Sequence, residues 1–172
     1  WPETLDALGN RRPVLSLAPA IGEVDILAAS ELLETGRAIR SGFVTPDRTR
    51  LIASTHRFFT TIEKMAMGDG RVDPDKLRQA AVARSRSQIM FDMEQLAAEA
   101  KSPLSAVLLG AIAGCGTLPI PPAAFMDGIR ADGRSVEANL RGFEAGLSAA
   151  TSETVPVDHP PFKRLSAQVK AA

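Results

Sequence analysis

Apolar and polar residues between positions 24 and 56 follow two different spacings, which together predict a strand, a helix and a second strand. Val24–Ala29 is an apolar run that ends in small residues, as expected of a buried strand. Leu32, Gly36 and Ile39 then recur at helical spacing, and residues 51–53 form a second apolar run. A unit of roughly 30 residues in this order predicts a βαβ crossover between parallel strands.

The ends of the predicted helix carry their own signals. Ser30 is expected to be the N-cap, because its hydroxyl can accept a hydrogen bond from an orphan amide of the first turn. Glu31 follows, where the positive end of the helix dipole favours a carboxylate. Gly42 is expected to close the helix in the left-handed geometry that glycine adopts readily. Pro46-Asp47 then turns the chain into the second strand.

Polar residues follow both predicted strands directly. They are Ser30 and Glu31 after the first strand, and Ser54, Thr55, His56 and Arg57 after the second. In open α/β sheets, ligands bind beyond the carboxyl ends of the strands, and parallel strands share that edge. We therefore expect these residues, called the rim below, to line the functional edge of the chain.

The rest of the chain is predicted to hold further strands and then helices. Residues 58–62 suit a strand, with a helix as the alternative, and residues 68–70 form a loop. Asp73-Pro74 is expected to start a helix that runs to about Ser87 with its basic residues in solvent, followed by a short strand at 88–92. Later helices are expected to start at Ser102-Pro103, Pro121-Pro122 and Ser135, with glycine-containing ends at 114–116 and 133.

These elements predict a three-layer α/β/α fold with a mostly parallel sheet and a helical C-terminal portion. Residues 1–150 are assigned to a single α/β domain, because 172 residues is a usual length for one domain. Prolines interrupt the sequence after Thr151, so residues 151–172 are assigned to a linker or C-terminal arm.

Charge and composition narrow the classes of function. The 20 basic and 20 acidic residues give a net charge of zero, which argues against a dedicated nucleic-acid-binding protein. Cys115 is the only cysteine, so this chain cannot supply the thiolates of an iron–sulfur cluster. The two histidines give no metal-ligand spacing, and no metal site is expected. Without a membrane-length apolar stretch or signal-peptide character, the chain is expected to be cytoplasmic and to make no membrane contact.

Two motifs could indicate catalysis, but neither has the arrangement that the chemistry requires. Residues 110–116, GAIAGCG, are similar to a glycine-rich phosphate loop, but such a loop opens a helix, whereas these residues end one. A packing and helix-ending role is expected instead. Ser54 and His56 could suggest a nucleophile and its base, but no acid is assigned to orient the histidine. We therefore expect no catalytic residue in this chain.

Several blocks of sequence resemble one enzyme family. Residues 24–38, with a buried strand followed by SELLETGRA, are similar to the gamma-type subunit of 2-oxoacid:ferredoxin oxidoreductases. FVTPDRTRLIASTHR at 43–57 and EKMAMGDGR at 63–71 resemble more specifically the beta subunit of indolepyruvate oxidoreductases. VLLGA, GTLP and VEANLRGF then follow in the family's order, at 107–111, 116–119 and 136–143. The resemblance covers about residues 11–150.

The resemblance implies a division of labour between subunits. A large partner subunit would bind thiamine diphosphate and iron–sulfur clusters and would decarboxylate a 2-oxoacid such as an arylpyruvate. The acyl group would pass to coenzyme A, and the electrons would pass to ferredoxin. This chain would carry no cofactor of its own and would be inactive alone. The rim would face the partner subunit or coenzyme A.

Two features depart from the family's pattern. Many members carry an asparagine just before V-x-L-G-A, where this chain has Leu104-Ser105-Ala106. The family's domain also begins with a strand and a G-G-Q-G-type turn, and neither occurs here. Because the chain opens on Trp1, we expect that an N-terminal segment of the native domain is missing.

Two other functions stay open at the level of sequence. A Rossmann-type nucleotide- or NAD-binding enzyme needs a glycine turn after its first strand, which the expected missing segment could supply. A non-catalytic interaction module would add nothing to the turnover of a thiamine-dependent partner. Binding of NAD by the full-length protein and turnover in the presence of the partner distinguish these alternatives.

Overall fold

A computed structural model of the chain describes Gly9 and residues 17–56 and 73–153. From Ala20 onward these residues belong to one compact unit, residues 20–157, to which the description below applies. The second unit, built from the two chain ends, has only Gly9 and residues 17–19 among its described residues, and these form no helix or strand. The strand or helix expected at 58–62 and the loop expected at 68–70 lie outside the described residues.

The sheet consists of β1 (Ile26–Ala29), β2 (Arg50–Ser54) and β3 (Ser87–Phe91), in the order β1-β2-β3. Both pairs of strands are parallel, with Ile26 opposite Arg50 and Ala53 opposite Met90. This arrangement confirms the α/β class and the parallel sheet that the sequence predicts.

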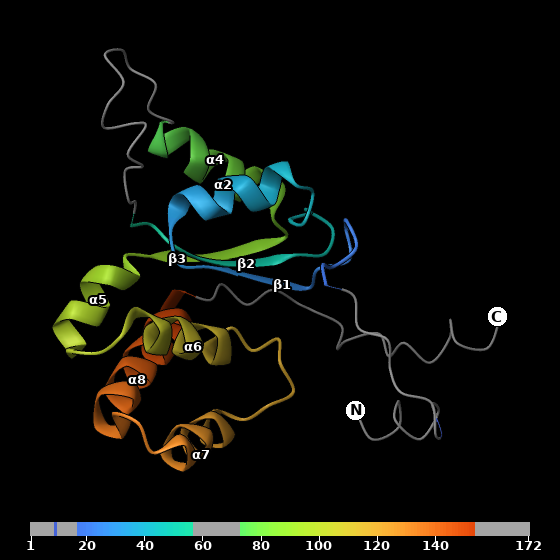
Figure 1. Cartoon of the computed structure of the whole chain (residues 1–172). Coiled ribbons are helices and arrows are strands. Elements are labelled where there is room, and N and C mark those ends of the chain that lie inside the picture. The colour runs from blue at the N-terminus through green and yellow to red at the C-terminus, as the bar shows by residue number, and fades with distance from the viewer. Residues whose placement is uncertain (1–8, 10–16, 57–72, 154–172) are drawn as a thin grey trace. The chain divides into compact units, whose positions relative to one another are not determined.

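Helices cover both faces of the sheet. Figure 1 shows α2 (Leu32–Arg40) and α4 (Pro74–Arg84) on one face and α6 (Leu104–Gly114) on the other. The remaining helices are α5 (Met93–Ala100), α7 (Pro122–Asp132) and α8 (Val136–Glu153). They lie on the α6 side, where α8 also contacts α5, α7 and β3. The chain thus forms three layers, with its C-terminal half concentrated in one of them.

The central strand β2 joins two apolar cores. Leu51 and Ala53 pack toward α2 and α4, in a cluster that includes Ala81. Ile52 points to the opposite face and packs with Val107 of α6 and other members of a second cluster. Because successive side chains of a strand point to opposite faces, one apolar run supplies both cores.

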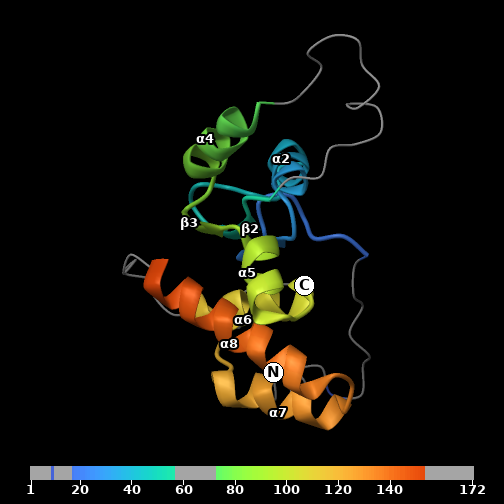
Figure 2. The same ribbon diagram turned by 90° about the vertical axis from the view of Figure 1, so that its left-hand side faces the viewer.

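The second core is closed by an unusually close approach of α6 and α8, which Figure 2 shows side by side. A Cβ built on Gly110 would overlap the carbonyl oxygen of Phe143, and one built on Gly146 would overlap that of Val107. Each helix therefore presents a glycine to the backbone of the other. This contact confirms the expected packing role of Gly110, and Gly116, which follows the C-cap of α6 with a φ of +69°, confirms the expected helix-ending role.

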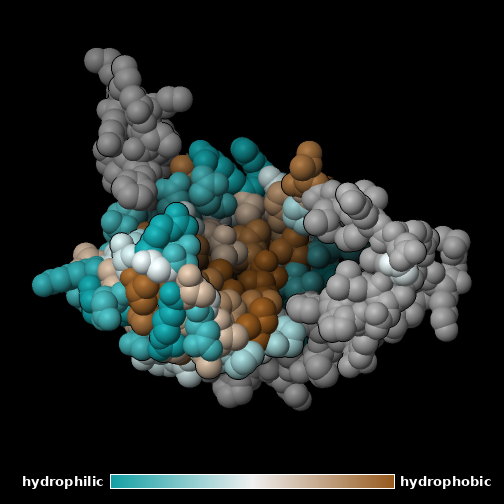
Figure 3. All heavy atoms as spheres, turned by 60° about the horizontal axis from the view of Figure 1, so that its bottom comes forward, coloured by the Kyte–Doolittle hydropathy of each residue, from teal (hydrophilic) through white to brown (hydrophobic). Residues whose placement is uncertain are grey.

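Apolar side chains also reach the surface on the α6 side. Ile26 of β1 and Leu108 and Ile112 of α6 pack against the second core but stay partly exposed. Figure 3 shows apolar residues gathered on this side of the molecule.

The helix boundaries confirm some of the expected signals and correct others. Gly42 has a φ of +76°, and the Gly42 and Phe43 amides donate to Ile39 and Ala38, which closes α2 as expected. Asp73 caps α4 by accepting a bond from the Asp75 amide at 2.9 Å.

The expectation that the α4 helix runs to about Ser87 is wrong. The helix ends at Arg84, and Ser85 is already extended. The Arg86 amide donates to the Thr49 carbonyl at 2.9 Å, and Ser87 then pairs with Arg50 in the sheet. Residues 85–87, which the helical pattern alone assigns to α4, therefore leave the helix and lead into the paired strand β3.

Arg50 anchors the amino end of β2 inside the protein, where it is 7% exposed. Its Nε donates to the Ser87 hydroxyl at 3.0 Å, and its Nη1 donates to the Cys115 carbonyl. Cys115 is the C-cap of α6, where the helix dipole favours a cation. This buried guanidinium ties α6 to two strands of the sheet.

No helix in the described part of the chain is by itself long and apolar enough to cross a membrane. Only α5 and α6 taken together have that length and composition, and a bend of 112° separates them.

Replacing Gly146 with alanine is expected to lower the free energy of unfolding by about 3 kcal/mol or more, because the added methyl meets backbone rather than a movable side chain. Urea denaturation of both proteins measures the difference. Gly128→Ala is the matched control, since a Cβ built on this residue of α7 would meet nothing within 4 Å. The control is expected to gain up to about 1 kcal/mol from helix propensity. Equal effects of the two substitutions would contradict the close packing.

Candidate functional site

The structure brings the described rim residues to one edge of the sheet. Ser30 and Glu31 directly follow β1, and residues 54–56 form the end of the neighbouring strand β2 and the residues after it. The Leu32 amide donates to the His56 carbonyl at 2.9 Å, which joins the two segments. The Thr55 amide donates to the Phe91 carbonyl at 2.9 Å and links the edge to β3. Arg57 lies outside the described residues.

The expectation that Ser30 is the N-cap of α2 is wrong. The N-cap is Glu31, which is extended, and no side chain makes a capping bond there. The orphan amide of Leu32 is instead satisfied by the carbonyl of His56. The residues after β2 therefore supply the cap, which leaves Ser30 exposed on the rim.

Ser54 shapes the rim from inside rather than from its surface. It is fully buried, and its hydroxyl accepts bonds from the His56 amide at 3.2 Å and the Met93 amide at 3.1 Å. Met93 is the first residue of α5, whose N-cap Asp92 accepts from the Gln95 amide. The Ser54 hydroxyl thus fixes both the turn after β2 and the start of α5.

Thr55 and His56 are the half-buried members of the rim that follow Ser54. The main chain of each is held by the bonds to Phe91 and Leu32 described above. Both side chains are therefore carried on a backbone that is fixed to the neighbouring strand and helix.

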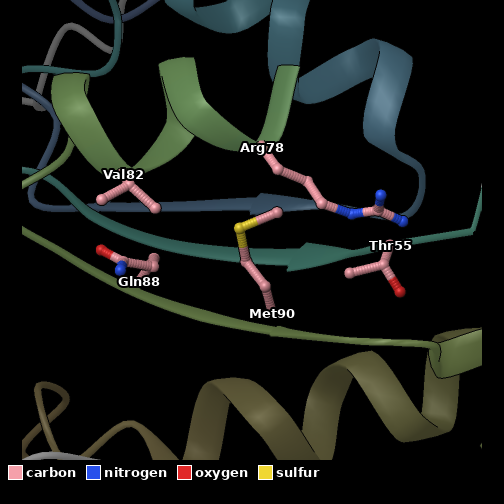
Figure 4. A pocket seen from close by; sticks show the side chains of 5 residues that line it. All are labelled: Thr55, Arg78, Val82, Gln88 and Met90. Carbon is pink, nitrogen blue, oxygen red and sulfur yellow. The ribbon is translucent and has the colours of Figure 1, made fainter. Parts of the chain in front are cut away.

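A cavity of about 340 Å³ opens beside the rim, between α4 and β3. Thr55, Arg78, Val82, Gln88 and Met90 line it (Figure 4). Of these, the sequence predicts only Thr55 as a site residue, because its pattern assigns Arg78 to the solvent-facing side of the helix. The sequence does contain a signal for these residues. Arg78 and Val82 have the spacing of one helix face, and Gln88 and Met90 have the spacing of one strand face.

Within residues 17–56 and 73–153, no group of three or more histidine, cysteine, aspartate or glutamate side chains is placed to hold a metal ion. What the site offers chemically is a set of hydroxyl, carboxylate, imidazole, guanidinium and amide groups at the end of a parallel sheet. Such groups can recognise a polar ligand or a partner surface.

A parallel α/β domain with a polar edge at the carboxyl ends of its strands defines the class of this chain, and comparison with known proteins defines its family. Residues 8–149 match the model of the family described as pyruvate ferredoxin/flavodoxin oxidoreductase. The chain belongs to this family, and so to the subunits and domains of 2-oxoacid:ferredoxin oxidoreductases. Neither the curated proteins nor the solved structures gave a match.

The family match confirms the resemblance to the gamma-type domain of these oxidoreductases. The more specific likeness to the indolepyruvate enzymes stays a prediction, as do the roles of the rim residues.

Replacing Ser54 with alanine is expected to lower the free energy of unfolding by about 1–3 kcal/mol, because the buried amide of Met93 and the partly buried amide of His56 lose their acceptor. Thermal and urea denaturation measure the loss. Ser30→Ala serves as the control and is expected to change stability by less than about 0.5 kcal/mol, since Ser30 is exposed and makes no cap. A loss of about 1 kcal/mol in the control would instead restore Ser30 as a capping residue.

Proposed function

We propose that this chain is the non-thiamine-binding subunit of an indolepyruvate or related aryl 2-oxoacid:ferredoxin oxidoreductase. The complex would convert the 2-oxoacid to an acyl-coenzyme A, with ferredoxin as the electron acceptor. The family match over residues 8–149 carries the proposal. The likeness of residues 43–57 and 63–71 to the indolepyruvate beta subunit supports the choice of substrate class.

The proposal assigns the redox and thiamine chemistry to a large partner subunit. A single cysteine cannot ligate an iron–sulfur cluster, which supports placing the clusters in that partner. Coenzyme A and the 2-oxoacid are the small-molecule partners, and we place the complex in the cytoplasm. The contribution of this chain is then to dock and to shape the approach to the partner's active site.

We propose that the rim is the part of this chain that faces the partner subunit or coenzyme A. Its described members are carried on backbone that is fixed by hydrogen bonds from α2 and to β3. Fixed backbone lowers the entropy lost when a surface binds its partner. Ser30, Glu31, Thr55, His56 and Arg57 would make the contacts, while Ser54 would hold the edge in shape.

The proposed function is tested by co-expressing the full-length protein with a large thiamine-binding subunit encoded beside it. Reduction of an electron-accepting dye is then assayed with arylpyruvates and coenzyme A. We expect turnover that depends on both substrates in the complex and none from the isolated chain. Turnover by this chain alone, or a complex whose activity does not require it, would contradict the proposal.

Replacing His56 and Arg57 together with alanine is expected to lower kcat/KM for coenzyme A by about tenfold or to weaken assembly by a similar factor, because both side chains are assigned to the facing edge. Size-exclusion chromatography measures assembly, and steady-state kinetics measures the dependence on coenzyme A. Arg130→Ala is the control. Arg130 is exposed on α7, on the α6 side of the sheet, and is not assigned to the rim. Unchanged assembly, turnover and coenzyme A dependence would remove both residues from the site.

A further inference from the structure

We propose that the cavity between α4 and β3 binds an elongated organic anion. Its carboxylate or phosphate would lie at the end formed by Arg78 and Thr55, and its apolar body would lie over Met90 and Val82. The proposal shares Thr55 with the rim but does not depend on the proposed function, because the binding belongs to this chain alone.

The walls of the cavity come from two elements with regular spacing. Arg78 and Val82 lie four residues apart on α4, so they are stacked one turn above the other on the same side of the helix. Gln88 and Met90 lie two residues apart on β3, so they share one face of the sheet. Thr55 continues the neighbouring strand beyond Ala53, the partner of Met90.

Because of this spacing, the lining residues follow one another along the cavity. Figure 4 shows the Arg78 side chain extending toward Thr55 at one end, Met90 in the middle, and Val82 above Gln88 at the other end. The cavity therefore has a cationic end, an apolar middle and an amide at the far end. A ligand that fits this order is longer than an inorganic ion and carries its charge at one end.

The cationic end retains donors for a ligand. Arg78 Nη1 donates to Asp75 Oδ1 at 2.9 Å, but the two side chains are 46% and 78% exposed. An ion pair this exposed contributes little, so an incoming anion can share or displace it. A guanidinium carries further N–H donors in a fixed fork that suits a carboxylate or phosphate.

The apolar part of the cavity wall consists of Met90 in the middle and Val82 toward the far end. Val82 is 56% exposed and is one of the few large apolar side chains with that exposure in the described part of the chain. Met90 has a flexible thioether side chain, which adapts its shape to a bound apolar group. Covering these two side chains with a ligand removes apolar area from water, which favours binding.

The far end and the volume set the size of the ligand. Gln88 has an amide that can bind a polar group, and its Oε1 lies 3.5 Å from the Ser85 hydroxyl. The cavity has a volume of about 340 Å³ and is open to solvent along Arg78, Val82 and Gln88, which are all exposed, so a bound ligand stays partly in water. An aryl or alkyl carboxylate and the phosphate-bearing arm of coenzyme A both have this chemistry, and the experiment below separates them.

The test measures binding to the full chain, without a partner subunit, by isothermal titration and by NMR chemical shifts. The probes are 3-phenylpropionate, its uncharged analogue 3-phenylpropionamide, and coenzyme A. We expect at least one of the two anions to bind with a Kd of about 1 mM or tighter and the amide to bind at least about tenfold more weakly. Binding of the carboxylate alone identifies a carboxylate ligand, and binding of coenzyme A alone identifies a phosphate-bearing one.

Two substitutions assign the binding to this cavity. Arg78→Gln is expected to weaken binding by at least about tenfold, because it removes the charge at the head of the ligand. Val82→Ser is expected to weaken it by about threefold, because it removes apolar contact at a position that is 56% exposed.

Arg130→Gln is the matched control. Arg130 pairs with Asp127 three residues earlier at 3.0 Å and is 52% exposed, so it resembles Arg78 in its ion pair and exposure but lies outside the cavity. We expect its substitution to leave binding unchanged. Equal losses in the two arginine variants, equal binding of the amide and the carboxylate, or no binding of either anion would each overturn the proposal. Failure of the reconstituted oxidoreductase would leave this result unaffected.

Discussion

The complete burial of β2 is the constraint on which the rest of the structure depends. Its five residues are buried, and both of its edges are paired in parallel with neighbouring strands. A strand in this position needs apolar cover on both faces, which α2 and α4 supply on one side and α6 on the other. At its two ends, polar groups must either form hydrogen bonds within the protein or stay exposed to water.

The polar groups at the two ends of β2 find their hydrogen-bond partners in different ways. At the amino end, Arg50 is buried and satisfied by Ser87 and by the carbonyl of Cys115. At the carboxyl end, Ser54 is satisfied by the amides of His56 and Met93, and the following residues emerge at the surface. One end therefore serves the fold, whereas the other combines an internal hydrogen-bond network with an accessible edge.

The helical layer beneath the sheet is organised by contact between backbones. Gly110 and Gly146 let α6 and α8 approach more closely than any side chain would allow. Such contact fixes the position of α8, which in turn packs against α5 and β3. The rim gains rigidity from this layer, because α5 begins at the amide that Ser54 holds.

Sequence alone determined the elements whose signals are local. The apolar run at 51–53, the proline after Asp73, and the glycines at 42 and 133 were sufficient to place a strand, a helix start and two helix ends. The order of these elements also gave the parallel sheet, and the blocks of family sequence gave the class of enzyme subunit.

Only the tertiary structure decided features that depend on partners distant in the chain. The first turn of α2 is capped by the carbonyl of His56 rather than by Ser30. The residues expected at the end of α4 pair with β2 instead. Arg78 and Met90 line the same cavity. Each of these outcomes joins residues at least about ten positions apart, and hydrophobic periodicity contains no information on such pairs. Local sequence determines which segments become helix or strand. Packing decides which polar groups form hydrogen bonds inside the protein and which stay exposed at the surface.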